Sequence, residues 1–201
     1  EVNVNFLTDE ELSSIREKEF SGKGLELVRD MFVFSCYTGL AYIDIFNLTK
    51  DQLSKGIDGN LWIITNRQKT GSASNIPLLP VAEEIIKKYE NHPVSSNSGK
   101  LLPVYTNQKV NEYLKTIAEN CGINKKLTFH CARHTFATTV TLGNNVSMES
   151  VSKMLGHKSI KTTQHYAKIL DSKVSQDMGS LKLVLEKKNE VQKENDKKLG
   201  S

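Results

Sequence analysis

The chain has 201 residues, of which 38% are hydrophobic and 25% are charged, and its formal net charge is +4. This length and composition fit one globular domain, or one domain with a short appendage, and so weak a positive charge does not by itself establish a polyanionic partner. The three cysteines, Cys36, Cys121 and Cys131, lack CxxC spacing, and no apolar run approaches the roughly 20 residues needed to cross a bilayer, so we expect a cytoplasmic protein without a disulfide framework, a cysteine zinc cluster or a membrane span.

The first part of the chain has the pattern of helices. Thr8, followed three residues later by Glu11, predicts a helix start with a capping box. Apolar residues recur at helical spacing over residues 25–37, which predicts a second helix that ends before Gly39. Residues 42–48 are typical of a further short helix.

The middle of the chain predicts a small sheet and the remainder predicts helices. Residues 60–65 and 74–78 have strand patterns and are separated by a turn-rich segment, so we expect them to pair in an antiparallel sheet. Residues 92–100, rich in Ser, Asn and Gly, predict a loop. Helices are predicted at 81–89, at 107–120, at 130–141, at 148–155 with Ser147 as N-cap, and from about Thr162 onward. The predicted fold class is therefore mainly α with a small antiparallel β-sheet (α+β).

Two segments in the second half carry side chains suited to phosphodiester chemistry. His130 and Arg133 are three residues apart, so on a helix they share a face, where a guanidinium can fork onto two phosphate oxygens while an imidazole moves a proton. Gly156 is expected to end a later helix and to bring His157 round at the turn, and Tyr166 follows nine residues after that histidine.

These segments resemble the HxxR and LGH boxes of the tyrosine recombinase (phage integrase) family, with the tyrosine that follows them. The similarity extends more weakly to residues 32–40 and to Lys69, and so covers most of residues 1–170. The resemblance implies the catalytic-domain fold of that family, with a three-stranded antiparallel sheet at one edge of a compact helical domain. It also implies an integrase or resolvase of a mobile element, which breaks and rejoins double-stranded DNA through a 3′-phosphotyrosine link without metal, cofactor or ATP.

The resemblance further implies a role for each matching residue. Tyr166 would attack the scissile phosphate and expel a 5′-hydroxyl, and His130 would be the proton acceptor that a phenol of pKa near 10 requires. Arg133 would clamp the non-bridging oxygens, His157 would hydrogen-bond the phosphate, and Lys69 would protonate the leaving oxygen. Proton transfer of this kind is worth roughly 10²- to 10⁴-fold in rate.

The sequence departs from the family at Ala41, which stands where the family carries a second phosphate-clamping arginine. Losing such a clamp outright costs roughly 3–4 kcal/mol, so an active enzyme is expected to replace it. Arg67 is the first candidate, because it lies two residues before Lys69 and alternate side chains of a strand point the same way. Arg29, on the helix that leads to residue 38, is the second candidate.

Two other classes of function are open. A relative that lost its chemistry together with the arginine would only bind DNA. A metal-dependent hydrolase is disfavoured: His130 and His134 have the i, i+4 spacing of zinc-binding helices, but Cys131 stands where a metalloprotease carries its Glu, and Arg133 would place a positive charge beside the metal. We expect His134 instead to be buried and to hydrogen-bond to the backbone.

Two pairs of lysines are candidates for contacts with the DNA backbone, which give affinity without sequence information. Lys125 and Lys126 lie just ahead of the HxxR box, and Lys158 and Lys161 lie close to Tyr166.

We expect residues 1–180 to form the catalytic domain and residues 181–201 to be a charged tail that is helical or disordered. The resemblance implies an N-terminal helical DNA-binding domain that is absent from this chain, which opens with Glu1 rather than Met. It also implies a tetramer on DNA that exchanges a C-terminal segment between protomers. An apolar stripe fits such a docking helix, although packing within one chain explains it equally well: Leu170, Val174, Met178, Leu181 and Leu185.

Overall fold

The computed structural model describes residues 5–167, 175, 178–179, 181–183 and 185–186. The chain divides into two units, Glu1–Ala167 and Lys168–Ser201. The described residues of the second unit are helical. Leu170 and Val174 of the apolar stripe lie outside the described residues, and the domain boundary at residue 180 stays a prediction.

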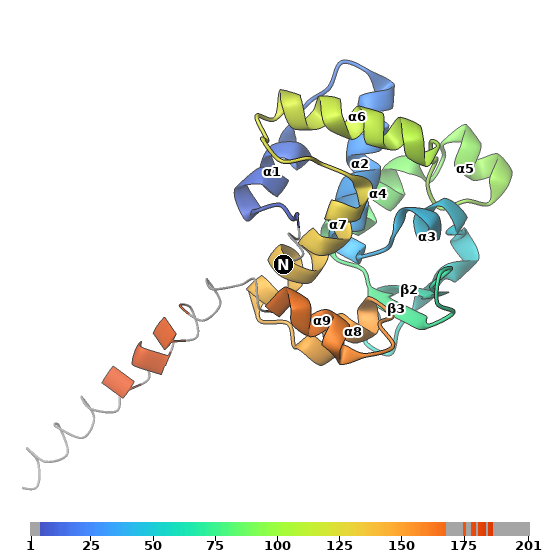
Figure 1. Ribbon diagram of the computed structural model, residues 1–201. Coiled ribbons are helices and arrows are strands. Elements are labelled where there is room, and N and C mark those ends of the chain that lie inside the picture. The colour runs from blue at the N-terminus through green and yellow to red at the C-terminus, as the bar shows by residue number, and fades with distance from the viewer. Residues whose placement is uncertain (1–4, 168–174, 176–177, 180, 184, 187–201) are drawn as a thin grey trace, which may run out of the picture. The chain divides into compact units, whose positions relative to one another are not determined.

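The first unit is mostly helical (Figure 1). In chain order its longer elements are α1 (Asp9–Glu17), α2 (Lys23–Thr38), α3 (Tyr42–Asn47), β1 (Leu53–Lys55), β2 (Leu61–Asn66), β3 (Ala73–Pro77), α4 (Pro80–Tyr89), α5 (Pro93–Ser98), α6 (Asn107–Asn120), α7 (Phe129–Thr135), α8 (Met148–Met154) and α9 (Ile160–Ala167). A π-helix, η2 (Phe136–Thr141), continues α7, and short 3₁₀ turns lie at η1 (Lys50–Gln52) and η3 (Leu142–Asn144).

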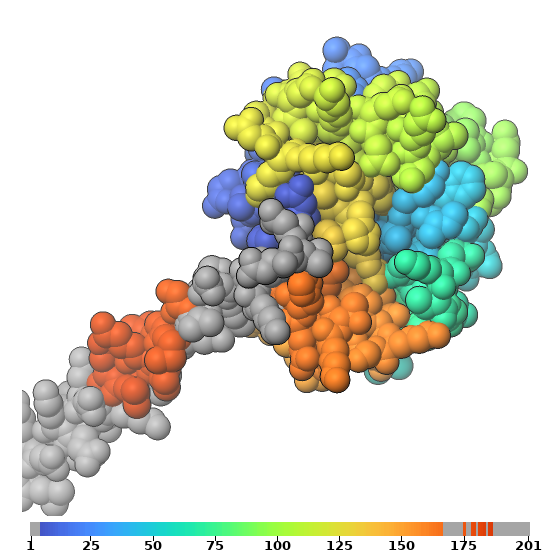
Figure 2. Space-filling view, viewed as in Figure 1, coloured from blue at the N-terminus to red at the C-terminus, as the bar shows by residue number. Residues whose placement is uncertain are grey.

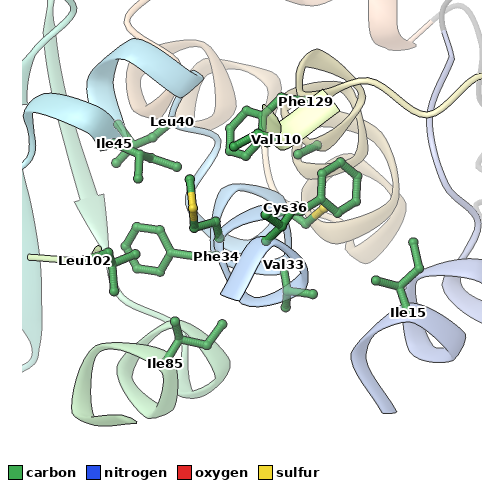
Figure 3. Packing of buried hydrophobic residues seen from close by; sticks show 14 of the residues in the cluster. Ile15, Val33, Phe34, Cys36, Leu40, Ile45, Ile85, Leu102, Val110 and Phe129 are labelled. Atoms are coloured by element: carbon green, nitrogen blue, oxygen red, sulfur yellow. The ribbon is translucent and has the colours of Figure 1, made fainter. Parts of the chain in front are cut away.

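Helix α2 is the centre of this unit, since α1, α4, α6 and α7 all pack against it. Buried side chains surround α2 on every side, as expected of a core helix rather than a surface helix. Phe32 meets Phe129 of α7 edge to face, with ring centroids 6.2 Å apart. Figure 3 shows the resulting cluster, in which Val33, Phe34 and Cys36 of α2 project toward side chains of the surrounding elements. The site described below is therefore built on a rigid core.

The three strands form one antiparallel sheet, as predicted, and their order is β1-β2-β3. Ile63 of β2 stands opposite Ile76 of β3, and both are buried against the helices. Strand β3 contacts α8, where the Ser74 hydroxyl donates to the Met154 carbonyl. This contact fixes the β2–β3 hairpin beside the turn that follows α8 (Figure 1).

Several predicted details are confirmed and two are wrong. Thr8 and Glu11 form the reciprocal capping box, and Ser147 caps α8 through the Ser150 amide. The segment 92–100 is not a loop: α5 forms there, with Pro at its first position and the His92 ring as its N-cap acceptor. The helix predicted at 130–141 is not uniform either, because it changes from α7 into the π-helix after Thr135. Among the described residues no helix has both the length and the apolar character to span a membrane.

Candidate active site

Helix α7 carries three of the polar side chains of the site: His130, Arg133 and His134. In the space-filling view the gold atoms of α7 lie between the cyan segment of α3 and the orange segment of α8 and α9 (Figure 2). Arg133 is 5% exposed, and it donates to the carbonyl oxygens of Gly39 and Leu155, both at 2.6 Å. This guanidinium therefore joins the C-terminal ends of α2 and α8. Each of its terminal nitrogens carries a second N–H, which is free to meet an anion.

Both carbonyls are presented by tight turns that require glycine. Gly39 has φ +70° and a Cβ there would lie 2.5 Å from the Phe136 ring. Gly156 has φ +60° and its Cβ would lie 2.8 Å from Cγ of Arg67. Because other residues adopt such a φ only at a cost, and because neither Cβ fits, both positions need glycine.

The Arg67 side chain extends from the end of β2 to the Leu155 carbonyl, which Arg133 also contacts. It follows β2, is 8% exposed, and donates from Nη1 to the Leu155 carbonyl at 3.0 Å. Its Nε lies 2.7 Å from Oδ2 of Asp44, but Nε has no hydrogen-bond partner, so this contact is an ion pair whose N–H is not aligned with the oxygen. Arg67 and Arg133 thus meet at one carbonyl oxygen.

Asp44 is the carboxylate that holds this arrangement, and it is not among the site residues predicted from the sequence. Its side chain is 1% exposed, and its oxygens accept from the amides of Ala41 and Gln68 at 3.3 and 2.9 Å, in addition to the ion pair with Arg67. A buried carboxylate needs such partners. The spacing of Ala41 and Asp44 at the start of α3 is that of an N-cap and its N3 residue, which was the available signal.

The His157 ring is oriented by a hydrogen bond with Thr163. Its Nδ1 lies 2.8 Å from the hydroxyl of Thr163, which is fully buried in α9. The other ring nitrogen, Nε2, is left for an external partner. The ring is nearly parallel to that of Tyr166, with an interplanar angle of 10° and centroids 6.4 Å apart.

Tyr166 lies in α9 and is 6% exposed. Its hydroxyl lies 3.1 Å from Nδ1 of His134. Among the described residues His134 is the one that hydrogen-bonds this hydroxyl. The sequence predicts His130 as the acceptor of the phenolic proton and a backbone partner for His134. The expectation for His134 is wrong, since its ring meets the tyrosine.

Burial and the surrounding charges lower the pKa of both His157 and His134. Burial, then the charges of Arg133 and Arg67, lowers the pKa of His157 to about 4. Burial, then His130 and Arg133, lowers the pKa of His134 to about 4.

His130 and Tyr166 are shifted by the same surroundings. His130 is largely exposed, yet enough protein surrounds its ring that desolvation, followed by Arg133, Arg67 and Lys69, lowers its pKa. For Tyr166, burial raises the pKa of the phenol, while Arg133 and Arg67 act in the opposite direction. The site thus holds neutral imidazoles, a neutral phenol and an excess of guanidinium charge, which suits a bound anion.

The comparisons with known proteins assign this constellation to a family. The model of the phage integrase family matches residues 5–173. The chain belongs to this family. A tyrosine recombinase XerC of Rickettsia canadensis is 29% identical over 170 residues, covering 79% of this chain and 50% of the relative. A tyrosine recombinase XerD of Lacticaseibacillus casei is 30% identical over 172 residues, covering 80% and 57%.

Solved structures of the family share the fold. The crystal structure of XerA recombinase matches with a TM-score of 0.69 and 21% identity, covering 88% of this chain and 65% of that chain. XerH bound to a palindromic difH substrate, in a post-cleavage complex, matches with a TM-score of 0.65 and 20% identity, covering 87% and 52%. The predicted recombinase catalytic-domain fold is confirmed. The chain spans about half the length of the curated relatives it matches.

In the phage integrase pattern an arginine stands at the position of Ala41, so this chain lacks that guanidinium. Ala41 and His130 line the same surface cavity, of about 450 Å³, together with residues of α3 and α6. Arg29, one of two candidates to replace the arginine expected here, lies elsewhere. It pairs with Asp30 at 2.5 Å and donates to the carbonyls of Arg16 and Lys18, so it ties α1 to α2.

The lysines predicted for catalysis and for DNA contact differ in their exposure and in their partners. Lys69 is exposed in the turn after β2, within electrostatic reach of His130. It does not share a strand face with Arg67, because β2 ends at Asn66 and Arg67 turns inward. Lys125 is engaged by Glu11 at 2.6 Å and by the Phe6 carbonyl at 3.1 Å, which removes it from the candidates for DNA contact.

The two remaining sets of residues concern DNA and metal. Lys126, Lys158 and Lys161 are exposed. Within the described ranges no group of three or more His, Cys, Asp and Glu side chains is arranged to hold a metal ion.

Proposed function

We propose that this chain is the catalytic domain of a site-specific recombinase, which breaks and rejoins double-stranded DNA through a 3′-phosphotyrosine link made by Tyr166. The observation that carries the proposal is the convergence of two guanidiniums, Arg67 and Arg133, on the Leu155 carbonyl, within electrostatic reach of the Tyr166 phenol and of His157. A cluster of positioned cations beside a nucleophile is what phosphoryl transfer requires.

In this proposal each side chain acts on one part of the phosphodiester. Arg133 and Arg67 bind the non-bridging oxygens, and Arg67 thereby supplies the charge that Ala41 lacks. His157 donates to the phosphate from Nε2, since Thr163 engages its Nδ1. Lys69 protonates the 5′-oxygen that leaves. The imidazoles of His130 and His134 lie close together, with ring centroids 4.4 Å apart, and that of His134 contacts the phenol.

The partner in this proposal is double-stranded DNA, and the names of similar structures support it: XerH was solved with difH DNA, and a lambda integrase dimer was solved with a COC′ core site. The last of these matches with a TM-score of 0.61 and 20% identity, covering 81% of this chain and 47% of that chain. The mobile-element origin and the cytoplasmic location stay predictions.

The tetramer on DNA is part of the same proposal. Met178, Leu181 and Leu185 of the apolar stripe are 59%, 48% and 50% exposed, so a second protomer has an apolar surface to cover. Sedimentation of the DNA complex tests this: Leu181→Asp should reduce the assembly and Leu183→Asp, which lies off the stripe, should not.

The test of the cleavage reaction is a covalent adduct. A pool of duplexes with randomised sequence, each nicked a few nucleotides 3′ of the cleavage window, supplies a substrate without knowledge of the natural site. The short 5′-hydroxyl strand dissociates after cleavage and traps the phosphotyrosine. The wild-type protein should form an adduct that resists denaturant, and Tyr166→Phe should form none while it still binds DNA.

A second function rests on Ala41. If the missing arginine is not replaced, the chain binds DNA without cutting it. The same experiment separates the two functions, because a DNA-binding relative without chemistry retards the duplex in a gel but leaves no adduct in the wild type.

A further inference from the structure

The hydrogen bond between His134 and Tyr166 is not accounted for by any role given above. His134 lies one residue after Arg133, so it points away from the Leu155 carbonyl and toward α9, where its Nδ1 meets the phenolic oxygen at 3.1 Å. The two rings are tilted by 52°, with centroids 5.5 Å apart. The imidazole therefore contacts the atom that would attack the phosphate.

The backbone around His134 fixes the direction of its ring. The π-helix begins two residues later, and the hydroxyl of Thr138 donates to the His134 carbonyl at 2.8 Å. The His130 ring stands edge to face against the His134 ring, with an interplanar angle of 83°. π-Helical turns are frequent at functional sites, and here the turn coincides with the contact to the nucleophile.

The charges around His134 keep its imidazole neutral. The groups that face it are His130 and Arg133 on its own helix, and Tyr166 and His165 on α9. Because burial and the nearby cations disfavour the imidazolium, its pKa is lowered to about 4, so an unprotonated ring nitrogen is available at neutral pH. A phosphate bound at Arg133 and Arg67 would bring negative charge to the site and would make the imidazolium less costly.

We propose that His134 is a catalytic residue, and that its Nδ1 accepts the proton of Tyr166 as the phenolic oxygen attacks the phosphorus. The O–H bond of Tyr166 breaks and the O–P bond forms, while the bond from phosphorus to the 5′-oxygen breaks and Lys69 gives that oxygen a proton. Rejoining reverses the transfer, and His134 returns the proton to the phenolate. This inference rests on the proposed recombinase function and replaces His130 as the acceptor.

The variants His134→Asn and His134→Ala test this role, with His165→Asn as the matched control, because His165 is exposed and its ring also lies beside that of Tyr166. Asn keeps a hydrogen-bonding group near the position of Nδ1 but accepts no proton at neutral pH. We expect cleavage of the nicked duplexes by His134→Asn at pH 7 to fall roughly 10²- to 10⁴-fold, with DNA affinity unchanged. His165→Asn should cleave at the wild-type rate.

Two further measurements distinguish proton transfer from a structural role. The rate of His134→Asn should rise steadily with pH, because hydroxide then removes the phenolic proton, whereas the wild-type rate should level off. Added imidazole should restore part of the activity of His134→Ala, in proportion to its neutral form. A folded variant whose low rate responds to neither pH nor imidazole would overturn the inference.

The remaining outcomes are also decisive. A His134→Asn protein that cleaves as fast as the wild type, or faster, would show that the contact is dispensable or holds the nucleophile back, and the inference would fail while the recombinase function stood. A wild-type protein that forms no adduct would instead remove the recombinase function, and the inference with it.

Discussion

Arg67 and Arg133 donate to one carbonyl oxygen, that of Leu155, at 3.0 and 2.6 Å. Two guanidiniums so close repel one another: burial and then the charge of Arg67 lower the pKa of Arg133 to about 10. Asp44 contributes one negative charge against these two positive charges. The surplus charge is neutralised when an anion binds, so the site is organised in advance for a phosphate group.

The first prediction follows from this pair of residues. Arg67→Ala should lower the rate of adduct formation by roughly 10²- to 10³-fold, which is the usual cost of a lost oxyanion donor. Arg29→Ala should leave the rate unchanged, since Arg29 is bound to Asp30 and to the end of α1. If both variants retain full activity, neither arginine replaces the one expected at Ala41.

A second variant separates lost charge from lost folding. Arg67→Ala also leaves Asp44 without its cation, which costs about 3–5 kcal/mol of stability when a buried pair is broken. Ala41→Arg introduced into the Arg67→Ala protein should restore part of the cleavage rate, because Ala41 borders the cavity beside His130 and a guanidinium there would reach the site. A damaged fold would not be repaired by this substitution.

The second prediction concerns the glycine that packs against Arg67. Gly156→Ala places a Cβ 2.8 Å from Cγ of Arg67 in a backbone with φ +60°. The left-handed backbone costs roughly 1–2 kcal/mol, and the collision adds roughly 1–3 kcal/mol. Urea unfolding should therefore show a larger loss of stability than in Gly122→Ala, where φ is +66° and no atom lies within 4 Å of the new Cβ.

Cleavage should distinguish the same two glycine variants. Gly156→Ala displaces Arg67, so its adduct formation should fall, whereas Gly122→Ala should cleave at the wild-type rate. Equal losses of stability in the two variants would mean that the contact with Arg67 carries no energetic weight.

The motif residues could be predicted from the sequence because their spacing alone carries the information. Arg133, His157 and Tyr166 lie in segments whose local patterns are specific, and the strands and most helices follow from periodicity. The residues that position these side chains could not be predicted in this way. Whether Arg67 turns inward depends on β2 ending at Asn66 and on the buried carboxylate of Asp44, which is distant in sequence.

The hydrogen bond between His134 and Tyr166 could not be predicted from the sequence either. His134 and Tyr166 are 32 residues apart, and their contact depends on how α9 packs against the π-helix. A π-helix has no distinct apolar period in a short segment, so the sequence indicates one continuous helix over 130–141. The helix at 93–98 was missed for a simpler reason, since its Ser and Asn residues are typical of loops.

The third prediction is that the protein loses stability in mild acid. His134 and His157 have pKa values of about 4 in the folded protein and about 6.5 when unfolded. As the pH falls below 6.5 the unfolded chain binds protons that the folded protein does not, so stability decreases until the pH reaches about 4. At pH 5 each histidine should account for about 1 kcal/mol, after allowance for its partial exposure.

Urea unfolding at pH 7 and pH 5 measures this loss of stability. In His157→Gln the difference between the two pH values should shrink by about 1 kcal/mol, because one of the two groups no longer titrates. Identical differences in the wild type and in His157→Gln would contradict the assignment of this acid sensitivity to His157.

The fourth prediction concerns the face that meets DNA. Lys158 and Lys161 are exposed just before and within α9, the helix of Tyr166, so under the proposed function each is expected to contact a phosphate. Each contact contributes about 0.9 to the slope of log affinity against log salt concentration, so replacing both lysines by Glu should flatten the slope by at least about 2 × 0.9 = 1.8. Lys87→Glu, on the exposed face of α4, changes the charge without removing such a contact and should leave the slope unchanged. Binding to a duplex of arbitrary sequence, titrated at several salt concentrations, measures the slopes, and a slope equal to that of the wild type in the double variant would place the DNA on another face.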